Sequence, residues 1–281
     1  MPHPRRAAVL GSPIEHSLSP VLHMAAYAAL GLADWTYTAI ECDEAGLPSL
    51  IDSFDGQWAG LSLTMPLKRA VLPLLDRTEP LAVEVDGANT VVFAGRERHG
   101  YNTDVSGMVA ALAGAGVTAP PGATILGAGA TACAALAALR AVGLAGAVVL
   151  VRDRAKAGDL LAAARRLGME VDLRPFGSEV RDGDLLVSTV PAGAADIYAE
   201  RAGGSRLGPA AVLDVVYDPW PTPLAQAAAK SGAVVVSGFD LLLHQAARQV
   251  ELITGLKPAP LARMRTAGEA ELARRVTLPL R

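Results

Sequence analysis

The sequence predicts an α/β protein built as two domains. Short apolar runs alternate with stretches of helical spacing almost from end to end, which is typical of parallel strands joined by crossover helices. A glycine-rich turn between an apolar run and an Ala-rich stretch, GATILGAGATA at residues 122–132, begins a second series of strands. With 281 residues, the chain is long enough for two ordinary domains.

The first series of elements contains four predicted strands, each an apolar or β-branched run: residues 7–10, 35–41, 58–63 and 90–93. We expect helices to start near Ser19, Ala45 and Pro66. Ser19 has a hydroxyl of the kind that caps a helix start. Pro20 suits the next position because it has no N–H to leave unpaired, and we expect Gly31 to end the helix.

The second series begins at the glycine turn and continues through four more apolar runs, which we interpret as strands: AVVLVRD, DLLVSTV, AAVLDVVY and AVVVSG, the last near Gly238. The last forty residues predict helices, within residues 240–255 and 261–276. No repeat of fixed period interrupts this alternation.

Composition excludes several classes of protein. A formal net charge of -3 with scattered Lys and Arg gives no broad basic face for nucleic acid. Cys42 and Cys133 are in no CxxC pair, so neither a zinc site nor a disulfide framework is expected, and we expect two buried free thiols. The apolar stretch at 132–151 contains Arg140 and Gly143, which disfavours a membrane span, and the short apolar N-terminus implies no export. We expect a cytoplasmic protein.

The glycine turn fits the GxGxxA pattern of dinucleotide-binding loops, with Gly127, Ala128, Gly129, Ala130, Thr131 and Ala132 in succession. The first glycine allows the tight turn, and the second lets the backbone approach a pyrophosphate at the helix N-terminus. A second strand ends about 25 residues further on, as such folds require. The pattern predicts a Rossmann-type domain, although a simple glycine turn between strand and helix remains the alternative.

Three charged residues, Arg152, Asp153 and Arg154, follow that second strand. NAD-binding folds commonly place an acidic side chain there for the ribose hydroxyls, whereas two guanidinium groups can hold a 2′-phosphate. We predict NADP, with Arg152 and Arg154 facing the phosphate and Asp153 pointing away. A solvated charged turn is the alternative.

Polar side chains gather at strand ends and helix starts of the first series. Ser17 and Ser19 could converge on a carboxylate. Lys68 lies in the first turn of the helix that Pro66 begins, where the helix dipole favours a neutral amine suited to proton transfer. Asn89 and Asp104 also lie at a strand end or a helix start, where open α/β sheets bind ligands. Helix capping is an alternative role for Ser19 and Asp104.

Eight stretches span nearly the whole chain: SPIEHSLSP, LTMPLK, GANT, YNTD, GAGAT, STVPAG, DVVYDPWPTPL and SGFDLLLHQA. In this order and spacing they resemble the shikimate dehydrogenase family, whose members reduce 3-dehydroshikimate to shikimate with NADPH in aromatic amino acid (chorismate) biosynthesis. The resemblance implies that Ser17 and Ser19 hold the substrate carboxylate and that Lys68 and Asp104 form the catalytic pair. It implies that the ring hydroxyls are held by Thr64, Lys68, Asn89, Asp104 and Gln245, with Tyr217 nearby. On the cofactor side it implies Gly127, Ala128, Gly129, Ala130, Thr131, Arg152, Thr189, Val215 and Gly238.

The resemblance also implies an architecture. Residues 1–105, completed by 239–281, would form the substrate-binding catalytic domain, and residues 106–238 would form the inserted NADP-binding Rossmann domain. The C-terminal helices return to the first domain because Gln245 must reach the substrate. The implied partner is a small-molecule substrate, with no nucleic acid, membrane or metal, in a monomer or homodimer.

Some positions depart from the family pattern. Ala130 stands where many members have glycine, Val151 where asparagine often precedes the arginine, and Asp153 where a small polar residue is common. Asp153 leaves the choice of cofactor open. Separately, a quinate or mixed-specificity dehydrogenase of the same superfamily is kept as an alternative, although two serines favour shikimate. A non-catalytic nucleotide-binding protein would be expected to lack Lys68 or Asp104, and both are present.

Overall fold

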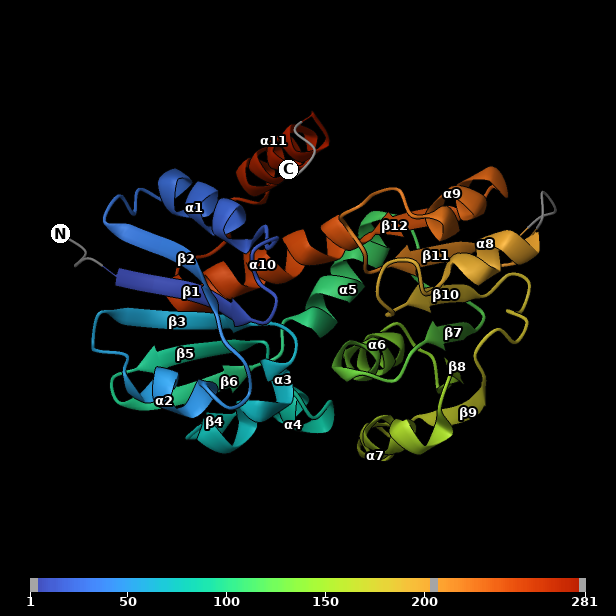
Figure 1. Cartoon of the computed structure of the whole chain (residues 1–281), viewed down its shortest axis with the longest axis horizontal. Coiled ribbons are helices and arrows are strands. Elements are labelled where there is room, and N and C mark those ends of the chain that lie inside the picture. Colours follow the sequence, from blue (N-terminus) through green and yellow to red (C-terminus); the bar gives the residue numbers. More distant parts are fainter. Residues whose placement is uncertain (1–4, 203–206, 278–281) are drawn as a thin grey trace. The chain divides into compact units, whose positions relative to one another are not determined.

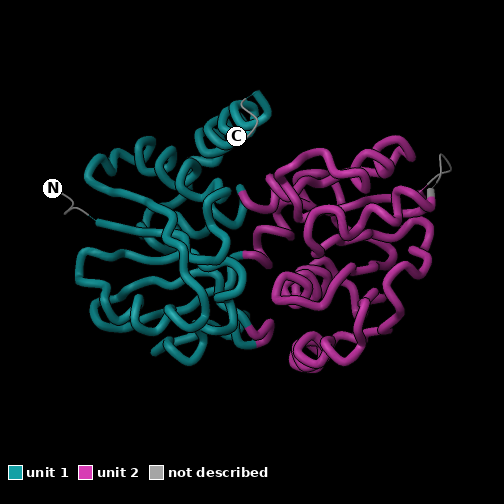
Figure 2. Tube along the Cα trace, in the orientation of Figure 1, with its two compact units in different colours: residues 1–83, 87–103, 243–281 teal, residues 84–86, 104–242 magenta. Residues whose placement is uncertain are grey.

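A computed structural model of the chain describes residues 5–202 and 207–277 (Figure 1). The chain divides into two compact units (Figure 2). Unit 1 comprises residues 1–83, 87–103 and 243–281, and unit 2 comprises residues 84–86 and 104–242. The units thus divide at 103/104 and 242/243, whereas the predicted functional domains divide at 105/106 and 238/239. Assigning substrate to one and cofactor to the other stays a prediction.

Unit 1 is built on a six-stranded sheet with the order β2-β1-β3-β5-β6-β4. Its strands are β1 (Arg5–Gly11), β2 (Trp35–Glu41), β3 (Trp58–Leu63), β4 (Arg77–Thr78), β5 (Thr90–Ala94) and β6 (Glu97–Tyr101). The helical segments of this part of the chain are α1 (Ser19–Ala29), α2 (Leu47–Asp52), α3 (Leu67–Ala70), η1 (Leu72–Leu74), α4 (Pro80–Glu84), α10 (Gly238–Thr254) and α11 (Leu261–Thr277).

The sheet of unit 1 is mixed, so the expectation of parallel strands throughout is wrong here. β1 pairs in parallel with β2 and β3, but β5 runs antiparallel to both β3 and β6. The pairing of β5 with β6 follows from the short turn between them, where Gly95 adopts a φ of 68°. Neighbouring parallel strands need a crossover of a dozen or more residues, whereas a turn this short makes a hairpin.

Both faces of β1 are buried, which explains its continuous apolar run. Side chains alternate between the faces of a strand, so Ala8 and Leu10 join one buried cluster and Ala7 and Val9 join another. The first cluster is closed by α2 and α3, and the second by aromatic side chains of α1 and β2 and by Ile253 of α10. The C-terminal helix α10 therefore contributes to the core of unit 1.

Unit 2 contains a parallel sheet with the order β12-β11-β10-β7-β8-β9. Its strands are β7 (Ala123–Leu126), β8 (Gly146–Val151), β9 (Glu170–Pro175), β10 (Leu185–Ser188), β11 (Ala211–Asp214) and β12 (Val234–Ser237). Counted from β7, this is the strand order of a doubly wound dinucleotide-binding fold, so the predicted Rossmann-type domain is confirmed.

The helical segments of unit 2 are α5 (Asp104–Gly114), α6 (Ala130–Ala141), η2 (Arg154–Ala157), α7 (Gly158–Leu167), α8 (Asp196–Ala202) and α9 (Pro223–Lys230). In Figure 1, α6 and α7 lie beside β7–β9, whereas α8 and α9 lie beside β10–β12. Every residue from Ala132 to Leu139 is buried, because small Ala side chains allow α6 to pack closely. No helix within the described residues is long and apolar enough to cross a membrane.

His23 is a titratable group buried in the core of unit 1. It is fully buried, stacks on Tyr37 with ring centroids 3.9 Å apart, and places Nε2 3.4 Å from Oε1 of Gln249. Burial lowers the pKa of His23 from 6.5 to about 3, and the hydrogen bond to Gln249 only partly opposes this. The imidazole is therefore neutral and donates from Nε2 to the amide oxygen.

We expect acid to destabilise the protein through His23. The unfolded chain takes up a proton there as the pH falls through 6.5, whereas the folded chain does so only near pH 3. Stability is thus fully present above pH 6.5 and declines towards pH 3, by at most about 1.4 kcal/mol per pH unit from this residue. Thermal unfolding from pH 7 to 4 should show a shallower decline in His23→Gln than in the wild type. Equal slopes would contradict this assignment.

Candidate functional site

The glycine turn of unit 2 joins β7 to α6. Gly127 has a φ of 100°, and a Cβ there would lie 2.9 Å from Oγ1 of Thr189, so this position requires glycine. Thr189 is fixed because its hydroxyl donates to the Leu126 carbonyl at 2.7 Å. Gly129 faces open space, and no side chain caps α6. The first N–H groups of this helix can therefore bind a phosphate.

All the predicted cofactor residues follow the carboxyl ends of strands of one sheet. They are Gly127, Ala128, Gly129, Ala130 and Thr131 after β7, Arg152 and Arg154 after β8, Thr189 after β10, Val215 after β11 and Gly238 after β12. β7 and β10 are neighbours in the sheet, and the strand order reverses between them. Open α/β sheets bind dinucleotides at such a switch point. The structure thus brings these residues to one edge of unit 2.

The three charged residues that follow β8, Arg152, Asp153 and Arg154, differ in their contacts. Arg152 is exposed. The Asp153 carboxylate accepts from the Ala155 N–H at 3.0 Å and so caps η2. Arg154 donates from Nη1 to the Leu173 carbonyl of β9 at 3.2 Å. Arg152 is therefore the better-placed candidate for a cofactor phosphate, while Asp153 already has a local partner.

The loop after β11, which carries Val215 and Tyr217, is held by Asp214. This buried carboxylate accepts from the Thr222 hydroxyl at 2.7 Å and from the Val216 N–H at 3.3 Å. Burial raises the pKa of Asp214, and the Thr222 hydrogen bond opposes the rise. Sequence reasoning did not single out Asp214, although an acidic residue that ends an apolar strand is a usable signal.

Gly238 shows a second close approach of backbone. A Cβ on Gly238 would overlap the carbonyl oxygen of Val215, so a side chain here would push apart the ends of β11 and β12. The glycine is thus required by packing, whether or not a cofactor passes over it.

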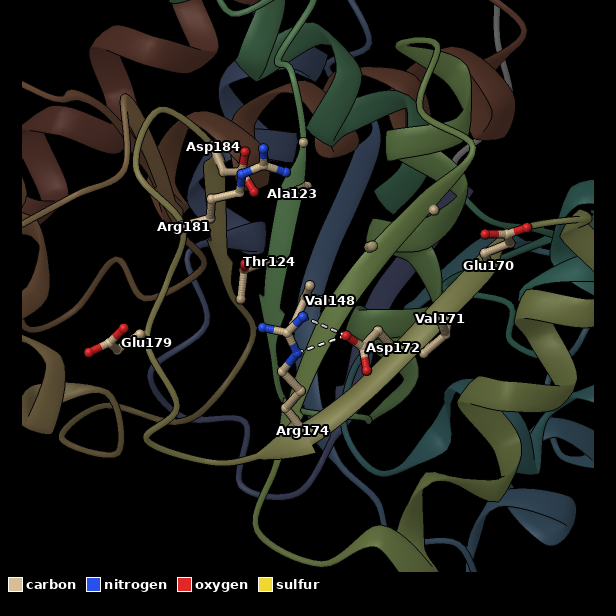
Figure 3. A pocket seen from close by; sticks show the side chains of 13 residues that line it. Ala123, Thr124, Val148, Glu170, Val171, Asp172, Arg174, Glu179, Arg181 and Asp184 are labelled. Atoms are coloured by element: carbon tan, nitrogen blue, oxygen red, sulfur yellow. Dashed lines mark hydrogen bonds and ion pairs between the residues drawn. The ribbon is translucent and has the colours of Figure 1, made fainter.

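Unit 2 also has a pocket of about 390 Å³ on the opposite side from the glycine turn. It is lined by residues of β7, β8 and β9 and by Glu179, Arg181 and Asp184 (Figure 3). Arg174 and Asp172 form an ion pair with N and O 2.7 Å apart within it. It lies at the amino ends of the strands, so it is separate from the predicted cofactor residues.

In unit 1, Ser17 lies between β1 and α1, and Ser19 is the first residue of α1. Leu18 already has helical angles and occupies the N-cap position, and no side chain caps α1. Ser17 Oγ accepts from the Ser19 N–H at 3.2 Å. The expectation that the Ser19 hydroxyl caps the helix is therefore wrong, because the chain enters the helix one residue earlier.

Thr64 directly follows β3, and Lys68 lies in α3. α3 is a single turn of four residues, so the argument that a helix dipole acts on Lys68 is wrong. The position of Lys68 is nevertheless fixed, because its carbonyl accepts from the Ala88 N–H at 2.8 Å. This bond joins the LTMPLK and GANT stretches, and both lie in unit 1.

Asn89 and Gln245 are brought together from distant parts of the chain. Asn89 Nδ2 donates to Gln245 Oε1 at 3.2 Å and to Thr103 Oγ1 at 3.0 Å. Asn89 Oδ1 accepts from the Thr103 N–H at 2.8 Å. Both predicted residues are buried. Thr103 is a polar partner that sequence reasoning missed, although it lies within the YNTD stretch.

Asp104 and Tyr217 belong to unit 2, whereas Ser17, Ser19, Thr64, Lys68, Asn89 and Gln245 belong to unit 1. Asp104 is buried and is the first residue of α5, and Tyr217 is half-buried. That the residues of unit 1 and those of unit 2 act together on one substrate is a prediction.

The cysteines and acidic groups offer no metal centre within residues 5–202 and 207–277. No group of three or more His, Cys, Asp or Glu side chains there is arranged to hold a metal ion. Cys42 and Cys133 are both buried, as predicted.

The strand order of unit 2 and its glycine turn define the class of protein, an α/β protein with a dinucleotide-binding type of domain. Residues 9–91 match the profile of the shikimate dehydrogenase substrate binding domain, and residues 238–267 match that of the shikimate 5'-dehydrogenase C-terminal domain. A protein of Geobacter metallireducens named shikimate dehydrogenase (NADP(+)) is 35% identical over 91% of this chain and 93% of its own. The chain therefore belongs to the shikimate dehydrogenase family.

Solved structures agree with this assignment. Mycobacterium tuberculosis shikimate dehydrogenase is 42% identical, with a TM-score of 0.84 over 95% of this chain and 100% of its own. A Thermus thermophilus shikimate 5-dehydrogenase in complex with NADP(H) and shikimate is 33% identical, with a TM-score of 0.81 over 95% and 99%. The predicted family and fold class are confirmed.

Proposed function

We propose that this chain catalyses the reversible reduction of 3-dehydroshikimate to shikimate with NADPH, and that it serves aromatic amino acid biosynthesis. One observation carries the proposal: all the predicted cofactor residues lie after the carboxyl ends of strands in a sheet of dinucleotide-binding order. Its relatives' names support the choice of reaction and of NADP(+).

On the substrate side, Ser17 and Ser19 hold the carboxylate, and Thr64, Asn89 and Gln245 hold ring hydroxyls, with Tyr217 nearby. The hydroxyl oxygens of the two serines follow the same strand end, and short polar donors there suit an anion. Unit 1 thus supplies most of the groups that recognise the substrate.

In the reaction, Lys68 and Asp104 move the proton. Bound NADPH supplies the hydride to the carbonyl carbon. Lys68 donates a proton to the carbonyl oxygen as this occurs and takes it back in the reverse direction, while Asp104 orients Lys68 and accepts from the reacting hydroxyl. A lysine fixed by its own backbone hydrogen bond to Ala88 is suited to this task.

On the cofactor side, residues 127–131 and the N-terminus of α6 hold the pyrophosphate, and Arg152 holds the 2′-phosphate. The open space over Gly129 and the uncapped helix start support the first role. The exposed position of Arg152 supports the second. Thr189, Val215 and Gly238 follow the next strand ends in order.

The test of this function compares shikimate with quinate, which carries an additional hydroxyl on the carbon that bears the carboxylate. Purified protein with NADP should oxidise shikimate with a kcat/KM at least about tenfold above that for quinate, since a site that fits shikimate has to accommodate and desolvate the additional hydroxyl of quinate. Comparable values would favour the mixed-specificity dehydrogenase. No oxidation of either compound would favour a nucleotide-binding protein.

Removing either serine hydroxyl should weaken substrate binding more than it slows the chemical step. A contact made equally in the ground and transition states raises KM and leaves kcat nearly unchanged. Ser17→Ala should also cost about 0.5–1.5 kcal/mol of stability, because Ser17 Oγ accepts from the Ser19 N–H. Steady-state kinetics with shikimate check the first effect and chemical denaturation the second. An unchanged KM in both Ser17→Ala and Ser19→Ala would remove the carboxylate assignment.

A further inference from the structure

The C-terminal helix α11 packs against α1 and reaches the loop that precedes α1. The two helices lie beside each other in unit 1 (Figure 1), and Met264 and Gly268 of α11 are buried. The last turn of α11 carries two neighbouring arginines, Arg274 and Arg275. Arg275 contacts the loop of residues 12–18, which contains Ser17. The end of the chain thus returns to a predicted part of the substrate site.

The peptide group between His16 and Ser17 is held at both of its polar groups. Arg275 Nη1 donates to the His16 carbonyl at 2.8 Å, and the Ser17 N–H donates to the Ile14 carbonyl at 3.0 Å. Because a peptide group is planar, these two hydrogen bonds together fix its orientation and with it the backbone of Ser17. Ser17 Oγ accepts from the Ser19 N–H at 3.2 Å, so its own hydrogen can be donated to an anion.

Glu271 holds Arg275 in place one turn back along α11. Arg275 Nε donates to Glu271 Oε1 at 3.0 Å, and both side chains are half-buried. A guanidinium group has five N–H donors in a rigid plane, so one edge can bind a carboxylate while another N–H reaches a carbonyl. Hydrogen bonds from Arg274 and Arg275 lower the pKa of Glu271 to about 2, against the effect of burial. The ion pair is therefore formed throughout the pH range of an activity assay.

We propose that Arg275 is a positioning residue for the substrate: it holds the His16 carbonyl and so keeps Ser17 where its hydroxyl binds the substrate carboxylate. The inference rests on the proposed function, because it takes Ser17 as a substrate contact. Arg275 bonds to the backbone before Ser17 and acts through it. A loop that is ordered before binding loses less conformational entropy when the carboxylate binds, so the contribution of Arg275 is to affinity.

The chain offers a matched control in Arg274. Its Nε and Nη2 both donate to Glu271, each at 2.8 Å, and its side chain has no other hydrogen-bond partner among the described residues. Arg274→Met and Arg275→Met therefore remove the same charge from adjacent positions of one helix and from the same acidic partner. Only Arg275→Met releases the His16 carbonyl.

The test measures kcat, KM and the Kd for shikimate and for NADP in these two variants. Arg275→Met should raise KM and Kd for shikimate by about three- to tenfold, the effect of one hydrogen bond, with kcat and the Kd for NADP changed by less than about twofold. Arg274→Met should leave all four values within about twofold of the wild type. An unchanged shikimate KM in Arg275→Met, or the same rise in Arg274→Met, would overturn the proposal.

A double-mutant cycle separates positioning of Ser17 from a general effect on the protein. In a Ser17→Ala background, Arg275→Met should cause no further rise in the shikimate KM, because the hydroxyl that it positions is gone. An equal rise in both backgrounds would overturn the proposal. If thermal unfolding shows that Arg275→Met does not fold, Glu271→Met replaces it, since this change removes the acidic partner that orients Arg275. That variant should raise the shikimate KM in the same direction, and no change would count against the proposal.

Amide hydrogen exchange reports on the loop itself. In the protein without substrate, the peptide that covers residues 12–19 should exchange faster in Arg275→Met than in Arg274→Met, because the loop has lost its bond to α11. Mass spectrometry of proteolytic peptides measures the difference. Equal exchange in the two variants would show that Arg275 does not order the loop.

The outcomes for the two levels of inference differ. A wild-type protein that does not oxidise shikimate with NADP would refute the proposed function. A wild type that does so, with a raised KM in Ser17→Ala but not in Arg275→Met, would refute only the role of Arg275.

Discussion

Replacing Lys68 by alanine is expected to lower kcat for shikimate oxidation by about 10²- to 10⁴-fold, the typical effect of losing a general acid or base. KM should change much less, because the carboxylate and ring hydroxyls keep their other partners. The variant should fold normally, since the contact that fixes this turn uses the Lys68 carbonyl and not its side chain. Steady-state kinetics together with thermal unfolding measure both properties.

Lys230 provides the control for this experiment. It is exposed and ends α9 in unit 2, so Lys230→Ala removes a lysine without touching the predicted site. Its kcat should equal that of the wild type. A small primary amine added to Lys68→Ala should restore part of the rate if the lost group moves a proton. A Lys68→Ala protein with wild-type kcat and a greatly raised KM would instead show that Lys68 only binds the substrate.

Replacing Arg152 by alanine is expected to weaken NADP binding by about 10- to 100-fold, while NAD binding hardly changes. Charge-assisted hydrogen bonds between a guanidinium group and phosphate contribute about 1.5–3 kcal/mol, and NAD lacks the 2′-phosphate. The comparison of kcat/KM for the two cofactors, in the wild type and in Arg152→Ala, measures this difference. The assignment fails if the wild type prefers NAD, or if both cofactors are weakened equally.

Two neighbouring substitutions sharpen that result. Arg154→Ala should have the smaller effect on NADP, because Arg154 already donates to the Leu173 carbonyl. Asp153→Ala should remove the cap of η2 and change cofactor preference little, since the carboxylate accepts from the Ala155 N–H. A sharp rise in NADP preference in Asp153→Ala would show instead that the acid faces the ribose and that the enzyme uses both cofactors.

The strands that the sequence predicts are those with an apolar or β-branched run. Most residues of β1, β3, β7, β8 and β10 are buried, and β2 buries Trp35 and Tyr37. The apolar residues of these strands therefore indicate them in the sequence. β9, EVDLRP, escapes prediction because it is a sheet-edge strand with mostly exposed or half-buried side chains. β6, ERHGY, escapes it because its pairing with β5 depends on a short turn.

The sequence allows a site residue to be predicted where that residue directly follows a predicted strand. Gly127 and Arg152 each follow a predicted strand, and carboxyl ends of parallel strands share one edge of a sheet. The buried hydrogen bonds that join Tyr37, Ser62 and Gln249 could not be predicted in this way. Tyr37 meets Ser62 across 25 positions and Ser62 meets Gln249 across 187, and strand periodicity alone does not fix such pairings. The short length of α3, which removes the helix-dipole argument for Lys68, could not be predicted either, because it depends on packing beyond the four residues of this helix.

The proposed reaction is tested directly with shikimate that carries deuterium on the carbon whose hydroxyl is oxidised. Wild-type protein is mixed with this substrate and NADP, and the reduced cofactor is isolated and analysed by mass spectrometry. We expect NADPH to form and to carry the deuterium, because hydrogen passes as hydride directly from substrate carbon to cofactor. The absence of NADPH, or NADPH without deuterium while the label appears in water, would contradict it.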